Sequence, residues 1–227
     1  MLSLFATLWQ ADSAFPNGGF AFSNGIEGLA DLGQRLDREG LTNVLAMALT
    51  HRWMGMDRIA VSLAFAAADE MDRLAEIDLR FDAATIPALQ RAGSRRNGLG
   101  LLTAHARLGT GAAAEMKRQV ETGRMRGHLP VIQGAVWRAC GMDETSVLAA
   151  SAYTAVTGMT SAAVRLSLIG AVEAQSCLRA TLPLMARLVD DAGRAGPLTC
   201  DDFESLTPML DIATMRHATS EVRLFSN

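Results

Sequence analysis

The longest uncharged stretch of the chain is the feature that most constrains its fold. Residues 147–164 contain no Asp, Glu, Lys or Arg, and Arg165 follows them directly. Their length would allow a membrane span, but Ala, Ser, Thr, Val and Gly predominate over the Leu, Ile and Phe that favour insertion. Small side chains also allow neighbouring backbones to pack closely. We therefore expect a buried helix with other helices packed around it, and no membrane partner.

Arg165 is the unusual residue of this segment, because it places a charge at the end of an apolar run. An unpaired buried charge is strongly unfavourable, so the guanidinium must find carboxylates or backbone carbonyls. Glu173 and Gln175 lie nearby in the sequence and are the candidate partners. We accordingly predict structural roles for Arg165 and Gln175.

The composition favours an all-helical fold. Of the 227 residues, 49% are hydrophobic and 20% are charged, which is typical of a globular chain that buries a sizeable core. Aromatic residues make up only 5%, whereas Ala, Leu and Met, which favour helices over strands, are abundant. No alternating strand pattern, internal repeat or interdomain linker is found. The sequence predicts a single all-α domain over residues 1–227, a bundle of roughly ten helices.

Apolar spacing and capping residues predict the positions of these helices. Residues 41–53 and 56–74 fit two antiparallel amphipathic helices, with Gly55 near the joint. Asp143 is the expected N-cap of the uncharged helix. Further helices are expected at 85–108, 112–121, 131–140, 169–191, 200–206 and 209–216.

Charge and cysteine usage limit the partner classes and the compartment. The net charge is −3 and the longest basic run is Arg95-Arg96, so no nucleic-acid partner is expected. The three cysteines are odd in number and far apart, which favours a reducing compartment over a disulfide framework. The apolar N-terminal residues 2–10 lack the basic region of a signal peptide. We therefore predict a cytoplasmic protein.

Motifs of metal or enzymatic chemistry are missing from the sequence. The four histidines show no metal-ligand spacing, and neither HExxH nor CxxC occurs. The phosphate-binding GxxxxGK[ST] loop and the GxSxG motif are also missing. A catalytic triad assembled from residues far apart in the sequence is an alternative that these motifs do not test. The twelve methionines are spread singly, which favours core packing over metal binding. No cofactor is predicted.

Residues 12–29, DSAFPNGGFAFSNGIEGL, are the most distinctive stretch. Pro16, Gly18 and Gly19 mark a turn in which glycine permits unusual backbone conformations. Three phenylalanines give this loop apolar anchors, which a flexible linker would not carry. The pattern is consistent with a loop that closes the fold and equally with a partner contact.

Three stretches together resemble the UreF family of urease accessory proteins: DSAFPNGGFAFSNGIEGL at 12–29, SAAVRLSLIGAVEAQ at 161–175 and PMLDIATMRHATSEVRLF at 208–225. The resemblance runs in order from about Leu8 to Phe225, and residues 127–134 add a weaker match. In the third stretch Ala218 replaces a frequent glutamate and Glu221 a frequent aromatic residue. These departures concern the detailed contacts of the tail.

The resemblance implies a helical scaffold without catalytic activity. Members of the family join accessory protein D or H, recruit the nickel-carrying GTPase accessory protein G, and deliver nickel to apo-urease, and they are usually homodimers. Their C-terminal segment contacts the D/H partner, which makes residues 216–227 a docking tail here. Residues 1–29 form the N-terminal segment with its Gly-rich loop. The partner-binding residues that follow from the resemblance are Pro16, Gly18, Gly19, Glu27, Arg216, His217, Arg223, Leu224 and Phe225.

An alternative hypothesis is that the protein activates GTP hydrolysis by accessory protein G. Such activators commonly insert an arginine that stabilises charge in the transition state. Arg124 and Arg126, in the polar loop of residues 122–128, are the candidates, whereas Arg165 is expected to be embedded. A third hypothesis is a helical enzyme acting on a small molecule, whose signature would be a pocket with polar lining.

Overall fold

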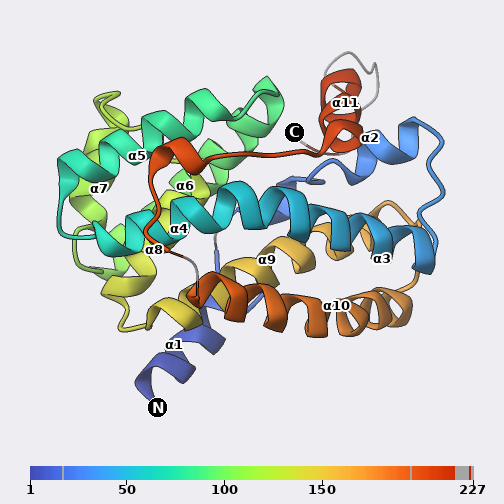
Figure 1. Ribbon diagram of the computed structural model, residues 1–227, viewed down its shortest axis with the longest axis horizontal. Coiled ribbons are helices and arrows are strands. Elements are labelled where there is room, and N and C mark those ends of the chain that lie inside the picture. Colours follow the sequence, from blue (N-terminus) through green and yellow to red (C-terminus); the bar gives the residue numbers. More distant parts are fainter. Residues whose placement is uncertain (17, 195, 218–224, 226–227) are drawn as a thin grey trace.

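The computed structural model describes residues 1–16, 18–194, 196–217 and 225, and its architecture is built from helices (Figure 1). The α-helices are α1 (Leu2–Ala11), α2 (Ile26–Asp31), α3 (Arg38–Met47), α4 (Arg58–Ala66), α5 (Met71–Ala84), α6 (Ala88–Leu108), α7 (Ala113–Glu121), α8 (Leu129–Ala139), α9 (Glu144–Arg165), α10 (Ala171–Gly193) and α11 (Pro208–His217). A π-helical segment, Ala48–Asp57, joins α3 to α4, and the 3-10 turns are Gly19–Ala21 and Cys200–Asp202. The described residues therefore form ten separate helices and no strand, which confirms the predicted all-α fold.

Helix α9, which contains the uncharged residues 147–164, lies in the middle of the bundle. It packs against α1, α2, α4, α8 and α10, and small residues such as Ala152, Ala162 and Ala163 are completely buried on it. The Asp143 carboxylate caps its first turn by accepting the Ser146 N–H at 2.8 Å. By length and composition α9 is able to cross a membrane, but 56% of its most apolar window is buried inside the fold. This burial confirms the prediction of a core helix.

The predicted joint at Gly55 is wrong, because α3, the π-helical segment and α4 form one continuous helix. This helix crosses most of the molecule from right to left in Figure 1. A glycine inside a helix costs only about 1 kcal/mol relative to alanine, so Gly55 alone does not end it. The chain turns instead at residues 67–70, before α5. A methyl group at Gly55 would overlap the backbone carbonyl of Glu204, so this glycine allows the backbone around Glu204 to pack directly against the helix.

The apolar residues of the helices meet in one continuous core. Trp53, Phe81 and Trp137 are its largest completely buried side chains. The indole N–H of Trp53 donates to the Ser151 hydroxyl at 3.2 Å, so this aromatic ring keeps a polar partner inside the core. The core includes Phe15 near the N-terminal end of the chain and Phe225 at its C-terminal end. Both of these residues therefore pack against the helical bundle.

Candidate partner-binding site

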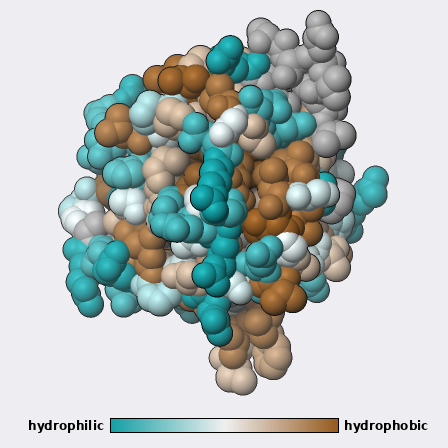
Figure 2. Space-filling view, turned by 90° about the vertical axis from the view of Figure 1, so that its right-hand side faces the viewer, coloured by the Kyte–Doolittle hydropathy of each residue, from teal (hydrophilic) through white to brown (hydrophobic). Residues whose placement is uncertain are grey.

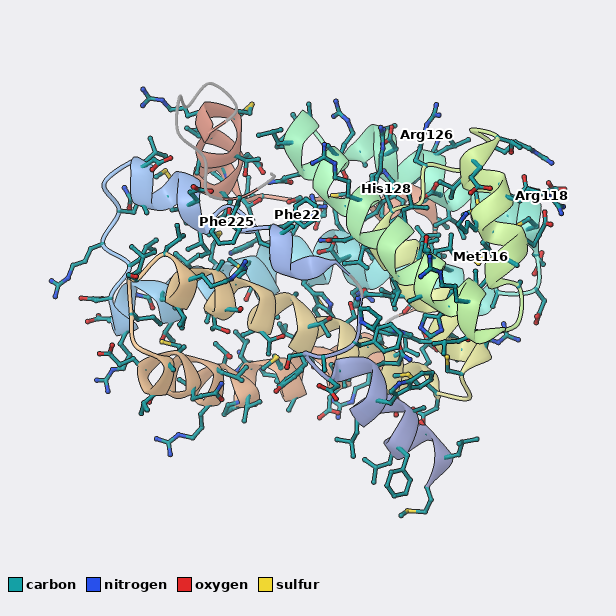
Figure 3. All side chains as sticks on the ribbon, turned by 180° about the vertical axis from the view of Figure 1, so that it is seen from behind. Phe22, Met116, Arg118, Arg126, His128 and Phe225 are labelled. Carbon is teal, nitrogen blue, oxygen red and sulfur yellow. The ribbon has the colours of Figure 1, made fainter. Side chains whose placement is uncertain are left out.

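The structure brings the three distinctive stretches of the sequence together at one place. We call this place the C-terminal junction and define it by Phe22, Glu27, Arg165 and Phe225. The Phe225 ring packs beneath the guanidinium of Arg165, whose Cζ lies 4.3 Å from the ring centroid. The Phe225 N–H donates to the Glu27 carboxylate at 3.2 Å. Phe22 and Phe225 lie near one another in Figure 3.

A close contact between α2 and α11 supports the junction. The two short helices pack side by side at one end of the molecule (Figure 1). A methyl group at Gly28 would overlap the Ala213 carbonyl oxygen, and one at Gly25 would come within 2.9 Å of Leu210. Glycine is therefore required at Gly28 by the approach of another backbone. The GIEG sequence brings α11 close and places the buried Glu27 between its two glycines.

Arg165 is half-buried and its partners differ from the predicted ones. Its Nε donates to the Ser161 carbonyl at 3.3 Å and its Nη2 to the Phe22 carbonyl at 3.5 Å. Glu173 instead accepts the Gly170 N–H at the start of α10, and Gln175 is exposed on that helix. Partial burial lowers the pKa of the Arg165 guanidinium from its usual value. Backbone carbonyls and an aromatic face therefore provide the environment of Arg165, which holds the loop and the tail together.

The other predicted partner-binding residues occupy different environments. Pro16, Gly18 and Arg216 are exposed, and Gly19 is half-buried. Arg223, Leu224 and the side chain of His217 lie outside the described residues. Phe225 is only 8% exposed, so its ring packs on the fold of the isolated chain and does not project from a free tail.

The distinctive loop is anchored by aromatic and histidine contacts that sequence reasoning missed. The Phe15 ring stacks on His105 at 5.1 Å between centroids. His105 Nε2 lies 3.0 Å from the side-chain oxygen of Gln10, Oε1, which also accepts the Trp137 indole N–H at 2.7 Å. Burial lowers the pKa of His105 from 6.5 to about 4. His105 is therefore neutral at neutral pH and joins α1 and the loop to the core.

The polar loop of residues 122–128 is held by a buried carboxylate. Asp78, completely buried on α5, accepts backbone N–H groups from Arg126, Gly127 and His128, the last two at 2.9 and 2.8 Å. Both candidate arginines are exposed, and Arg124 forms an ion pair with Asp72. The carboxylate thus fixes a loop that displays Arg124 and Arg126 to solvent.

His128 also joins Asp82 and Ser94 in an arrangement similar to a catalytic triad. Its Nε2 lies 2.8 Å from Asp82 and its Nδ1 lies 3.1 Å from the Ser94 hydroxyl. Burial lowers the pKa of His128, although Asp78 and Asp82 act in the opposite direction. His128 is completely buried, and the Ser94 hydroxyl accepts the Leu129 N–H at 3.2 Å. These contacts tie α5, α6 and α8 together around the loop, and Figure 3 shows His128 among those helices.

An apolar surface lies next to the C-terminal junction. Met209, Ile212 and Met215 are between 44% and 47% exposed, at a spacing that places them on one side of α11. Beside them is an open cavity of about 310 Å³ between α2, α3 and α11, whose apolar lining residues are Leu29, Leu36, Val44, Met47 and Met209. The view in Figure 2, onto the end of the molecule that carries α2, α3 and α11, shows hydrophobic patches among polar side chains. Among the described residues no group of three or more His, Cys, Asp or Glu is placed to hold a metal ion.

The fold and the junction define a class of protein: an all-α bundle whose distinctive residues join the loop before α2 to the C-terminal end of the chain beside an apolar surface. A family model named UreF matches residues 36–182. The urease accessory protein UreF of Kocuria rhizophila is 30% identical over 228 residues, which cover 99% of this chain and 97% of that protein. Its namesake from Arthrobacter sp. (strain FB24) is 32% identical over 94% of this chain and 92% of the relative. The chain belongs to the UreF family.

Proposed function

We propose that this protein is a urease maturation factor that acts in the cytoplasm as a non-catalytic scaffold. Together with accessory protein D/H it recruits the nickel-carrying GTPase accessory protein G, so that nickel is delivered to apo-urease. The observation that carries this proposal is the convergence of all three family-like stretches at the C-terminal junction. Residues that lie far apart in the sequence meet there, and their contacts hold the C-terminal end of the chain beside the exposed apolar face of α11.

The D/H partner binds, in this proposal, to the apolar face of α11 and the cavity beside it. Exposed apolar groups that gather on one face favour an interface, and methionine side chains adapt readily to a partner surface. Pro16, Gly18, Gly19 and Arg216 are further proposed partner contacts outside this face. His217, Arg223 and Leu224 are further proposed contacts from the tail. Glu27, Arg165 and Phe225 hold the tail in position, since two of them are buried and Arg165 is half-buried.

Co-expression with accessory proteins D/H and G tests this surface. Ile212→Asp places a charge on an exposed apolar position, so it should abolish co-purification while leaving the melting temperature nearly unchanged. Leu182→Asp is the matched control, because Leu182 is 45% exposed on α10 and Ile212 is 44% exposed on α11. An Ile212→Asp variant that still assembles with its partners would contradict the proposed docking surface.

We also propose that the protein forms a homodimer through α1. This helix carries no charge, and Leu2, Phe5 and Leu8 are between 60% and 71% exposed on it. It projects from the bundle, at the bottom of the view in Figure 2. Phe5→Asp should convert a dimer into a monomer when molar mass is measured by light scattering. A wild-type monomer, or a dimeric Phe5→Asp variant, would contradict this assignment.

Activation of the GTPase is the second candidate function, and the ordered loop of residues 122–128 is the observation that favours it. Asp78 fixes the backbone while Arg124 and Arg126 remain exposed, as an inserted arginine requires. If this function is correct, GTP turnover by accessory protein G rises by orders of magnitude on addition of the protein. Arg126→Ala should remove that effect. We expect little acceleration, because the proposed scaffold does not require it.

A further inference from the structure

The connection between the 3-10 turn Cys200–Asp202 and α11 crosses the π-helical segment. We call residues 203–207 the strap. It follows an extended course over the long continuous helix and leads directly into α11 (Figure 1). The Glu204 N–H donates to the Gly55 carbonyl at 2.9 Å, and the Leu206 N–H donates to the His51 carbonyl at 3.4 Å. Both acceptors belong to the π-helical segment Ala48–Asp57.

The distance between the two donors on the strap matches the distance between the two acceptors on the π-helical segment. Two residues of an extended chain span about 6.6 Å, and His51 and Gly55 lie about one helical turn apart on the other side. Glu204 and Leu206 therefore reach Gly55 and His51, respectively, with N–H groups that point in the same direction. Gly55 makes this possible, because a side chain there would overlap the Glu204 carbonyl. Single-turn π insertions are frequent at functional sites, and this longer π-helical segment carries the two acceptors of the strap.

A side chain of the π-helical segment is also linked to α11 through Gln90 of α6. Arg52 Nη1 donates to the Gln90 side-chain oxygen at 3.4 Å, and Gln90 Nε2 donates to Asp211 on α11 at 3.0 Å. Thr207, at the end of the strap, donates to the same Asp211 oxygen at 3.4 Å. The π-helical segment is thus linked to α11 by two indirect routes, through the backbone of the strap and through the side chain of Gln90.

We propose that the π-helical segment is the element that sets the position of α11, and that it controls the docking surface through the strap and Gln90. Gly55 and Gln90 are positioning residues in this device, since neither belongs to the apolar face of α11. The α2–α11 contact and the C-terminal junction fix the other side of α11. Loss of the strap would therefore loosen α11 at one side while the remainder of the bundle stays folded. The effect on partners rests on the scaffold function proposed above.

Hydrogen–deuterium exchange of the full chain tests the device without any partner. Gly55→Ala should displace the strap and increase exchange in residues 204–214 by about tenfold, as expected for local opening. Exchange in α8, residues 129–139, should stay unchanged. Gly193→Ala is the matched control, because nothing lies within 4 Å of a methyl group at that glycine. Gln90→Ala, which removes only the side-chain route, should give a smaller increase in the same residues and decides the matter if Gly55→Ala fails to fold.

The possible results separate the device from the docking surface. Unchanged exchange in residues 204–214, or an equal increase in α8 and α11, overturns the inference whatever the partners do. Faster exchange in α11 together with weaker co-purification of accessory protein D/H supports the device and the docking surface. Faster exchange with undiminished co-purification supports the device and refutes α11 as the docking surface.

Discussion

Replacement of Phe225 by alanine should destabilise the whole fold, although Phe225 lies at the end of the chain. Burial of a phenylalanine side chain contributes about 2–3 kcal/mol, and the contact with the Arg165 guanidinium at 4.3 Å adds about 1 kcal/mol. The measured effect is limited by the free energy with which the tail docks, because a detached tail leaves the bundle folded. We therefore expect a loss of about 2 kcal/mol, which lowers the Tm of a chain of this length by about 4–8 °C.

Urea unfolding and thermal melting followed by circular dichroism measure this loss. Leu108→Ala is the control, because Leu108 is 58% exposed at the end of α6 and its truncation removes little buried surface. Combining Phe225→Ala with Arg165→Met, which keeps the aliphatic stem but removes the charge, should reveal a coupling of about 0.5–1 kcal/mol. If Phe225→Ala melts within about 1 °C of the wild type, the inference that the junction holds the tail on the fold is refuted.

Three further perturbations test other contacts. The folded-state pKa of His105 is lowered from 6.5 to about 4, so its neutral form stabilises the fold above about pH 6.5 and this contribution is lost as the pH falls toward about 4. Between pH 7 and pH 5 the unfolding free energy of the wild type should therefore fall by about 2 kcal/mol more than that of the His105→Gln variant. Asp78→Asn leaves buried N–H donors without a carboxylate and should cost about 1.5–3 kcal/mol in urea unfolding, whereas Asp72→Asn, on an exposed residue, should cost less than about 0.5 kcal/mol. Gly28→Ala should destabilise by about 1–3 kcal/mol through overlap with Ala213, and a Tm equal to that of Gly193→Ala would show that α11 moves aside freely.

Local sequence patterns determined most of the helical architecture. The absence of charge in residues 147–164 predicted the core helix α9, because a helix without polar faces is stable only when other helices surround it. Asp143 predicted the start of that helix, since a carboxylate at an N-cap accepts a nearby backbone N–H. The family resemblance was likewise present in three stretches of sequence and is confirmed by full-length relatives.

Only the tertiary structure decided how the distant stretches meet. Gly55 reads as a helix joint because glycine often ends helices, but the Glu204 carbonyl occupies the space of its missing side chain. Arg165 was expected to pair with Glu173 or Gln175, which lie close in sequence, yet it bonds to the Phe22 carbonyl and covers Phe225. The spacing of residues along the sequence predicts which side chains meet within one helix. Contacts between residues more than fifty positions apart depend on how the helices pack, and the C-terminal junction and the strap are made of such contacts.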